Sequence, residues 1–304
     1  MVKRTLYIGS PAYLRLHLRQ IEIHRVLDSG EEDCAIRPIE DLAMVILDHP
    51  QITITHQLMR ALHQNKVVLL SCDEKHHPAA MMLPMEGHTL QTKRYRAQIR
   101  ASEPLKKNLW KQIIIAKVRN QMQVLAAIQR PYIKLKRMLH KVRSGDPDNI
   151  EGQAAARYWE LFLDGFQRDP DGLPPNNLLN YCYAVVRAMV ARAIVSAGLL
   201  PSLGIHHRNQ YNAFCLADDL MEPFRPFADL LVYDLWMQRA GDAMLELDRE
   251  VKARLLEVAT VDAYYGKRKM PLMAGLPMTA ASLAACYEGT KRKLVLPSIA
   301  LQPR

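Results

Sequence analysis

The spacing of apolar residues changes near residue 93, and this change constrains the fold more than any other feature of the sequence. Over residues 14–18, leucines alternate with Arg or His, and the alternation resumes in the opposite phase at Ile21 and Ile23. A period of two is typical of a half-buried strand, and the change of phase predicts a bulge or tight turn near Arg19. The first part of the chain is therefore predicted to be rich in β-structure.

After the change, the apolar residues follow the period of a helix. Ser102 can cap a helix whose first turn contains Pro104. An apolar stripe follows from Leu105 through Leu109 to Ile113. Further helices are predicted over 131–143, 149–166, 176–198, 209–222, 226–239, 243–258 and 278–288, with a turn-rich break over 266–275.

These patterns predict an α+β fold with two domains. A small β-rich N-terminal domain is expected over residues 1–75, a linker over 76–92, and a larger all-α domain over 93–304. A chain of 304 residues suits about two domains at ~150 residues each. Short apolar runs at 44–47 and 67–70 suit buried strands of the first domain.

The cysteines and the most apolar stretch bear on the compartment. The five cysteines are scattered singly and form no CxxC motif, so we interpret them as reduced thiols of a cytoplasmic protein. Residues 184–200 are the most apolar, but they carry Arg187 and Arg192, and no run of 18 uncharged apolar residues exists. The sequence therefore predicts no segment that spans a membrane.

The net charge of +10 is concentrated in one segment. Residues 93–143 contain fifteen Lys and Arg residues and one acid, Glu103, so the segment carries +14 and the rest of the chain −4. A solvated helix face usually interleaves both signs. The segment therefore favours a phosphate backbone as its partner over an acidic membrane surface or a merely solvated face. The DNA-binding candidates are Lys93, Arg94, Arg96, Arg100, Lys106, Lys107, Lys111, Lys134, Lys136 and Arg137.

Three carboxylates are predicted to share one helix face. Asp218 and Asp219 precede Glu222 by four and three residues, and like charges at these spacings repel. The repulsion requires a nearby cation, which is a divalent metal or an arginine, either Arg208 or Arg225. On their own, these residues favour a salt-bridged or solvated face over a metal site.

Two adjacent histidines add to this cluster. His206 and His207 follow a glycine-bounded turn at 198–204, so they can approach the same helix. One imidazole with carboxylates suits Mn²⁺ well and Mg²⁺ less well. Glu151, near a predicted helix start, is the candidate for a ligand from another helix. Its simpler interpretation is an acid in a first helical turn, where acids are favoured.

Four longer motifs occur in order along the chain. They are Asn149-Ile150-Glu151-Gly152-x-Ala-Ala, Asn177-x-x-Asn180-Tyr181-x-Tyr183-Ala184, Gly198-Leu199-x-Pro201-x-Leu203-Gly204-Ile205-His206-His207 and Leu216-Ala217-x-Asp219-Leu220-x-Glu222-Pro223-Phe224-Arg225-Pro226. In these motifs the chain resembles the CRISPR-associated endonuclease and integrase family that captures new spacers. The resemblance covers most of the chain, and its motifs are like those of systems whose effector is one large RNA-guided nuclease.

The resemblance implies one metal site. By motif position, Glu151, His207 and Glu222 are its ligands and its catalytic residues, with Mg²⁺ or Mn²⁺ as the cofactor. Asp219 matches a supporting acidic position, and His206 is the alternative to His207.

The resemblance also implies a reaction and partners. The reaction is insertion of short foreign DNA into a CRISPR repeat array by attack of a donor 3′-hydroxyl, in antiviral defence, with hydrolysis as the side reaction. The implied partners are double-stranded DNA, a second copy of the chain bound through the β domain, and a small dimeric CRISPR-associated protein. The alternatives are a general metal-dependent DNase on branched repair DNA and a non-catalytic DNA-binding scaffold.

Overall fold

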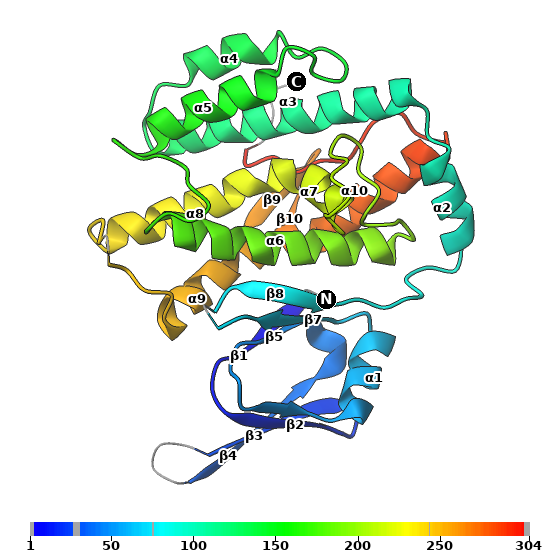
Figure 1. Cartoon of the computed structure of the whole chain (residues 1–304), viewed down its shortest axis with the longest axis vertical. Coiled ribbons are helices and arrows are strands. Elements are labelled where there is room, and N and C mark those ends of the chain that lie inside the picture. The colour runs from blue at the N-terminus through cyan, green and yellow to red at the C-terminus, as the bar shows by residue number, and fades with distance from the viewer. Residues whose placement is uncertain (1–2, 27–30, 75, 243, 301–304) are drawn as a thin grey trace.

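A computed structural model describes residues 3–26, 31–74, 76–242 and 244–300. A β-rich N-terminal part lies at one end of the molecule, and a larger helical part is stacked on it (Figure 1). The predicted α+β class and the order of its two parts are confirmed. The larger part is mostly helical and not all-α, because it contains a two-stranded sheet over 262–271. Residues 1, 75 and 304, which bound the predicted domains, lie outside the described residues.

The β-rich part contains two four-stranded sheets and helix α1 (His56–Gln64). The first sheet has the order β1-β5-β7-β8, made of β1 (Arg4–Ile8), β5 (Leu42–Leu47), β7 (Val68–Cys72) and β8 (Pro78–Met82). The second has the order β4-β3-β2-β6, made of β2 (Ala12–His17), β3 (Gln20–Val26), β4 (Glu32–Pro38) and β6 (Ile52–Ile54). The tight turn predicted near Arg19 is confirmed, since Leu18 and Arg19 have φ angles of 45° and 62° between β2 and β3.

The first sheet is buried on both faces. Val45 and Leu69 face a core shared with the second sheet and α1. Met44, Ile46 and Val68 belong to the core of the helical part. A strand buried on both faces needs apolar residues at successive positions, which is why β5 and β7 are continuous apolar runs in the sequence.

The helical part is built around α6. Its helices are α2 (Gln91–Ile99), α3 (Glu103–Ala127), α4 (Ile133–Leu139), α5 (Ile150–Phe162), α6 (Asn176–Ser196), α7 (Cys215–Met221), α8 (Arg225–Gln238), α9 (Arg249–Leu256) and α10 (Leu272–Tyr287). Figure 1 shows α6 next to β8 of the first sheet, with α7 and α8 on its other side. By length and composition α6 could cross a membrane, but 78% of its most apolar window is buried, as in the core helix of a globular fold.

Two predicted features differ in the structure. Strand β8 lies within the expected linker and pairs with β7. The break predicted over 266–275 is wrong in its second half, because α10 begins at Leu272, directly after a hairpin of β9 (Asp262–Tyr265) and β10 (Arg268–Pro271). Gly275 is tolerated inside α10, and a larger residue is not, because the ring of Tyr265 fills the space that a side chain there would occupy.

The helix predicted over 209–222 begins later, at Cys215. The side chain of Asn209 accepts a hydrogen bond from the Tyr211 amide at 3.0 Å, and that of Asn212 accepts one from the Phe214 amide at 2.9 Å. Such local side-chain acceptors stabilise turns at the expense of helix. Residues 199–214 therefore form a loop, and this loop carries both histidines.

Candidate metal centre

One buried face of α3 lies beside the candidate ligands. Lys117 and Asn120 are three residues apart on that face, and both are buried. The Asn120 amide nitrogen donates to the carbonyl oxygen of Pro223 at 2.8 Å. This bond holds the 3₁₀ turn Glu222–Phe224, which joins α7 to α8, next to Lys117.

Glu222 is the first residue of that turn. Its Oε1 atom accepts a hydrogen bond from Arg225 Nε at 2.8 Å, and its Oε2 atom is ion-paired with the Lys117 ammonium. Burial alone would raise the pKa of Glu222, but Arg225 and Lys117 outweigh it and lower the pKa to about 2. The carboxylate is therefore ionised throughout the physiological range.

Glu151 reaches the same lysine from the start of α5. Asn149 caps this helix in a left-handed conformation (φ 50°) and accepts a hydrogen bond from the Gly152 amide at 3.2 Å. The carboxylate of Asp146 accepts a second one from the Glu151 amide at 2.8 Å. These caps orient the first turn of α5, so that Glu151 ion-pairs with Lys117.

Sequence reasoning missed Lys117, because it was counted with the basic DNA-binding segment. Its side chain is 9% exposed, against 27% for Glu151 and 9% for Glu222. Desolvation would lower the pKa of Lys117, but Glu222 and Glu151 outweigh it and raise the pKa. The signal was present in the sequence, since Lys117 stands four residues after Ile113 on the apolar stripe of α3.

His207 is positioned by Asp219 of α7. The fully buried carboxylate of Asp219 accepts hydrogen bonds from three successive amides, those of Ile205 (2.5 Å), His206 (2.8 Å) and His207 (3.2 Å). Its Oδ1 atom also lies 2.5 Å from Nδ1 of the His207 ring. This bond raises the pKa of His207, in spite of partial burial. With Nδ1 facing a carboxylate, Nε2 is the nitrogen left for a ligand.

His206 has a different environment. Its ring stacks on that of Trp110 in α3, with centroids 4.3 Å apart and an angle of 1° between the planes. Burial, followed by the neighbouring His207, lowers its pKa. The geometry therefore favours His207 over His206 as the ligand. Trp110 also meets the edge of the His207 ring, at 5.7 Å between centroids.

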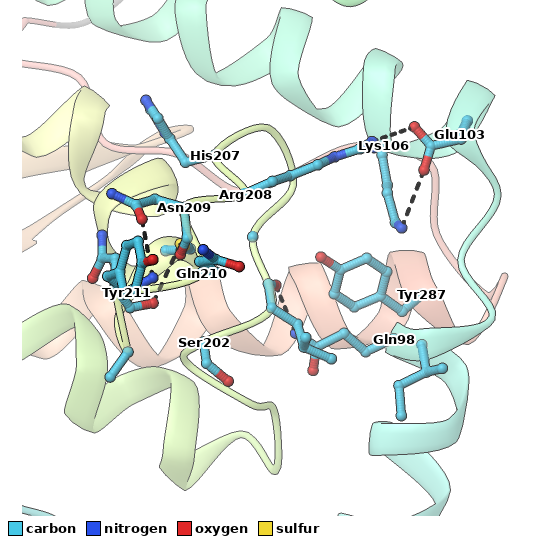
Figure 2. A pocket seen from close by; sticks show the side chains of 16 residues that line it. Gln98, Glu103, Lys106, Ser202, His207, Arg208, Asn209, Gln210, Tyr211 and Tyr287 are labelled. Atoms are coloured by element: carbon cyan, nitrogen blue, oxygen red, sulfur yellow. Dashed lines mark hydrogen bonds and ion pairs between the residues drawn. The ribbon is translucent and has the colours of Figure 1, made fainter.

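His207 stands between two cavities. One, of about 680 Å³, is lined by the 199–214 loop, α2, the start of α3 and Tyr287. Figure 2 shows the imidazole of His207 extending away from Gln98 and Tyr287, while Arg208 reaches Glu103, to which it is ion-paired at 2.6 Å. The other cavity, of about 490 Å³, is lined by His207 together with Glu222 and Arg225.

The structure brings the predicted ligands to one region without closing a ligand shell. Glu151 and Glu222 meet at Lys117, and His207 borders the Glu222 cavity. The three carboxylates predicted to share one cation have separate partners. Asp219 binds the loop, Glu222 binds Lys117 and Arg225, and Asp218 pairs with Arg187 at 2.8 Å.

A tighter group of ligand types exists elsewhere. It consists of Glu22, His24 and Cys34, on β3 and β4, whose ligand atoms lie within 4.8 Å of one another. In the described part of the chain, no other three His, Cys, Asp or Glu side chains come as close. Arg15 already binds this carboxylate through Nε (2.7 Å) and Nη2 (3.1 Å), and this pairing lowers the pKa of Glu22 to about 2. A metal ion is therefore not needed to balance the charge there.

The residues around Lys117 fit a divalent cation. The two carboxylates there are suitable donors for Mg²⁺ and Mn²⁺, and the imidazole of His207, which borders the same cavity as Glu222, suits Mn²⁺. The lysine ammonium already lies between the carboxylates, so the position suits positive charge. Apart from that ion pair, Glu222 Oε2 is buried and accepts no hydrogen bond from any residue the structure describes, so a lone pair remains available.

The basic candidates divide into exposed and engaged residues. The exposed ones are Lys93, Arg96, Arg100, Lys107, Lys134, Lys136 and Arg137. Lys106 and Lys111 are half-buried, and Lys106 pairs with Glu103 at 3.4 Å. Arg94 donates to Glu288 (3.3 Å) and to the carbonyl of Ala197 (2.8 Å), so it joins α2 to α10 and α6. The exposed cations of α4 lie at the end of the molecule opposite the β-rich part (Figure 1).

Solved structures share this fold. A casposase bound to an integration product has a TM-score of 0.80 and 22% identity, covering 97% of this chain and 92% of that one. A chain of a Cas6-RT-Cas1–Cas2 complex has a TM-score of 0.73 and 19% identity, covering 99% of this chain and 36% of that one. The fold class is therefore one found in proteins of CRISPR systems and in a casposase.

The chain belongs to the family described as CRISPR associated protein Cas1, whose model matches residues 6–244. It is 36% identical to a CRISPR-associated endonuclease Cas1 of Neisseria meningitidis serogroup C (strain 8013), over 98% of this chain and 97% of the relative. The family resemblance based on the four sequence motifs is confirmed.

Proposed function

We propose that this chain is a divalent-metal-dependent DNA endonuclease and integrase that inserts short DNA segments into a CRISPR repeat array. The observation that supports it most is the convergence of Glu151 and Glu222, from α5 and the α7–α8 junction, on one buried cationic position. The curated relative is named an endonuclease, and the casposase was solved with an integration product.

Glu151, Glu222 and Nε2 of His207 would hold the metal ion. When bound, Mg²⁺ or Mn²⁺ supplies Lewis-acid polarisation of the scissile phosphodiester and lowers the pKa of the attacking hydroxyl. The donor 3′-oxygen forms a bond to phosphorus, and the bond between phosphorus and the 3′-oxygen of the repeat strand breaks. Water in place of the donor hydroxyl gives cleavage without joining.

The other residues orient these groups. Asp219 fixes the ring of His207 and sets the proton on Nδ1, so that Nε2 carries the lone pair. Arg225 fixes Glu222, and its own guanidinium lies over the ring of Tyr183, 4.6 Å from the centroid. The exposed cations of α2, α3 and α4 bind the DNA backbone without reading its sequence.

The partners are part of the proposal. Double-stranded DNA serves as donor and as target, a second copy of this chain binds through the β-rich part, and a small dimeric CRISPR-associated protein joins two such dimers. One structural relative was solved as a Cas6-RT-Cas1–Cas2 complex. Two active sites held apart by such an assembly can join both ends of one donor.

A plasmid-joining assay tests the proposal. A labelled duplex with free 3′-hydroxyls is incubated with a repeat-containing plasmid, the small partner protein and Mn²⁺ or Mg²⁺. We expect joined product that EDTA abolishes. His207→Ala and Glu222→Ala should lose joining and retain most DNA binding, because phosphate contacts supply most of the affinity. Glu246→Ala, at an exposed glutamate between α8 and α9, is the matched control and should join normally.

The two alternatives predict different results. Cleavage without joining, with the partner protein present, indicates the general DNase. DNA binding that neither His207→Ala nor EDTA changes, with no cleavage at all, indicates the non-catalytic scaffold.

A further inference from the structure

We propose that the Lys117 ammonium is the resident cation of the Glu151–Glu222 site, and that a divalent ion enters by displacing it. This inference rests on the proposed metal dependence. It gives Lys117 a positioning role that differs from that of the exposed lysines around it, since it acts on the two carboxylates and not on DNA.

The contacts of Lys117 define this role. Its ammonium is ion-paired at once with Oε1 of Glu151 and Oε2 of Glu222, which come from elements 71 residues apart in the chain. Two carboxylates that face the same point repel unless a cation lies between them. Lys117 supplies that cation, so it keeps both ligands in place when no metal is bound.

Burial excludes a DNA-binding role for this lysine. Its side chain is 9% exposed, and its neighbours on α3, including Ile114, Val118 and Gln121, are buried as well. A buried ammonium is costly unless it is paired. Its two carboxylate partners meet this requirement, and a phosphate at the surface does not.

The charges show why the lysine and a metal ion exclude each other. Glu151 and Glu222 carry two negative charges, and Lys117 and Arg225 carry two positive ones, so this group is neutral without metal. A divalent ion added between the same oxygens would bring the net charge of this buried group to +2, the ammonium included. The ammonium must therefore move out of the space that the ion takes.

Of the two cations, Lys117 and Arg225, Lys117 is the one that can move. The guanidinium of Arg225 is held on two sides, because it donates to Glu222 at 2.8 Å and lies over the ring of Tyr183. The hydroxyl of Tyr183 donates in turn to Asp229, which fixes that ring. Lys117 has a flexible four-carbon stem, and its partner Glu151 is the more exposed carboxylate at 27%. The ammonium can move toward solvent on the Glu151 side while Arg225 stays in place.

The test compares Lys117→Met with the unsubstituted chain by Mn²⁺ calorimetry and by thermal unfolding. Without metal, Lys117→Met should unfold at a lower temperature, because Arg225 then balances only one of the two adjacent carboxylates. Mn²⁺ should reverse this loss, and the dissociation constant should fall by about tenfold or more, since no ion pair has to be broken. Lys269→Met is the matched control, because it removes an exposed Lys–Asp pair (3.0 Å) and should change neither measurement.

A second variant covers failure of the first to fold. In Lys117→Met/Glu151→Gln one negative charge is removed with the positive one, so this variant should fold without metal. If it is as unstable as Lys117→Met alone, the lysine does not act as a counter-charge and the proposal is wrong.

The outcomes also separate this inference from the proposed function. Loss of Mn²⁺ binding in Glu222→Gln shows that the unsubstituted chain binds the ion through Glu222. If that loss is seen but Mn²⁺ binds Lys117→Met no more tightly than the unsubstituted chain, only this inference fails. If no Mn²⁺ binding depends on Glu222 in any variant, the proposed metal site fails, and this inference fails with it.

Discussion

Asp219→Asn tests whether one buried carboxylate positions His207. The change keeps the size of the side chain and replaces one oxygen by an amide NH₂ group. Each oxygen of Asp219 accepts two hydrogen bonds, Oδ2 from the amides of Ile205 and His206, and Oδ1 from the amide and Nδ1 of His207. An NH₂ group at the Oδ2 position faces two amide donors, so two bonds are lost. At the Oδ1 position it faces the His207 amide and Nδ1, and it can donate to Nδ1 only if the ring proton moves to Nε2, which removes the lone pair from that nitrogen.

The magnitude follows from these bonds. A hydrogen bond to a charged acceptor contributes about 1.5–3 kcal/mol, so the loss of two amounts to about 3–6 kcal/mol. The loop around His207 can rearrange to limit this cost. That rearrangement displaces the imidazole, and a displacement of about 1 Å at a catalytic group can reduce the rate about 100-fold. We therefore expect both lower stability and a loss of joining of that order, with DNA binding retained.

Two assays measure this result, namely denaturant unfolding and plasmid joining with the partner protein. Asp248→Asn is the matched control. Asp248 caps α9 by accepting one hydrogen bond from the Val251 amide at 2.8 Å, and Asn is an equally good cap, so little change is expected. If Asp219→Asn unfolds at the same denaturant concentration as the original chain and joins at half its rate or more, the positioning argument is refuted.

Three further results are expected. Lys252→Met should lower the free energy of unfolding by about 1.5–3 kcal/mol, because it removes the ammonium at 2.7 Å from Asp48, which is 1% exposed, and leaves that carboxylate with Tyr7 and His76 as partners; an unchanged denaturant midpoint would contradict this. Burial raises the pKa of Asp229 to about 6, so the folded chain keeps a proton that the unfolded chain loses near pH 4, and this contribution to stability falls as the pH rises from about 4 to about 6. Asp229→Asn should flatten the stability profile over that window, and a profile with an unchanged slope would contradict the assignment. Lys134→Gln/Lys136→Gln should reduce the slope of log affinity against log salt for duplex DNA by about 2, and the idea that α4 binds phosphates fails if the slope stays the same.

The sequence predicted those parts of the fold that depend on local patterns. The alternation around the turn at Arg19 predicted β2 and β3, and Ser102 predicted the start of α3, whose Leu105 amide donates to the Ser102 hydroxyl at 3.4 Å. A helix over 149–166 was also predicted, and α5 begins at Ile150, with Glu151 in its first turn. The Asn209 and Asn212 turns were missed, although Asn is a known turn residue, because the apolar markers of α7 suggested a longer helix.

The arrangement of the candidate site was harder to predict from the sequence, because it depends on tertiary contacts. The motif order predicted Glu151, His207 and Glu222, but the repulsion argument treated Asp218, Asp219 and Glu222 as one cluster. The structure separates them, because each has its own donor from another element. Lys117 could not be separated from the other basic residues by a count of charges. Its place on the apolar stripe of α3 indicates burial, but its two partners come from α5 and the α7–α8 junction, and no local pattern identifies them.

The first sheet of the N-terminal part has a consequence for any attempt to divide the protein. Met44, Ile46 and Val68 stand in contact with helices on the side away from the second sheet. In a fragment that ends before α2, these side chains would form an exposed apolar surface, which favours self-association. The N-terminal fragment is therefore expected to precipitate or to need detergent when produced alone, and dimer studies need the intact polypeptide.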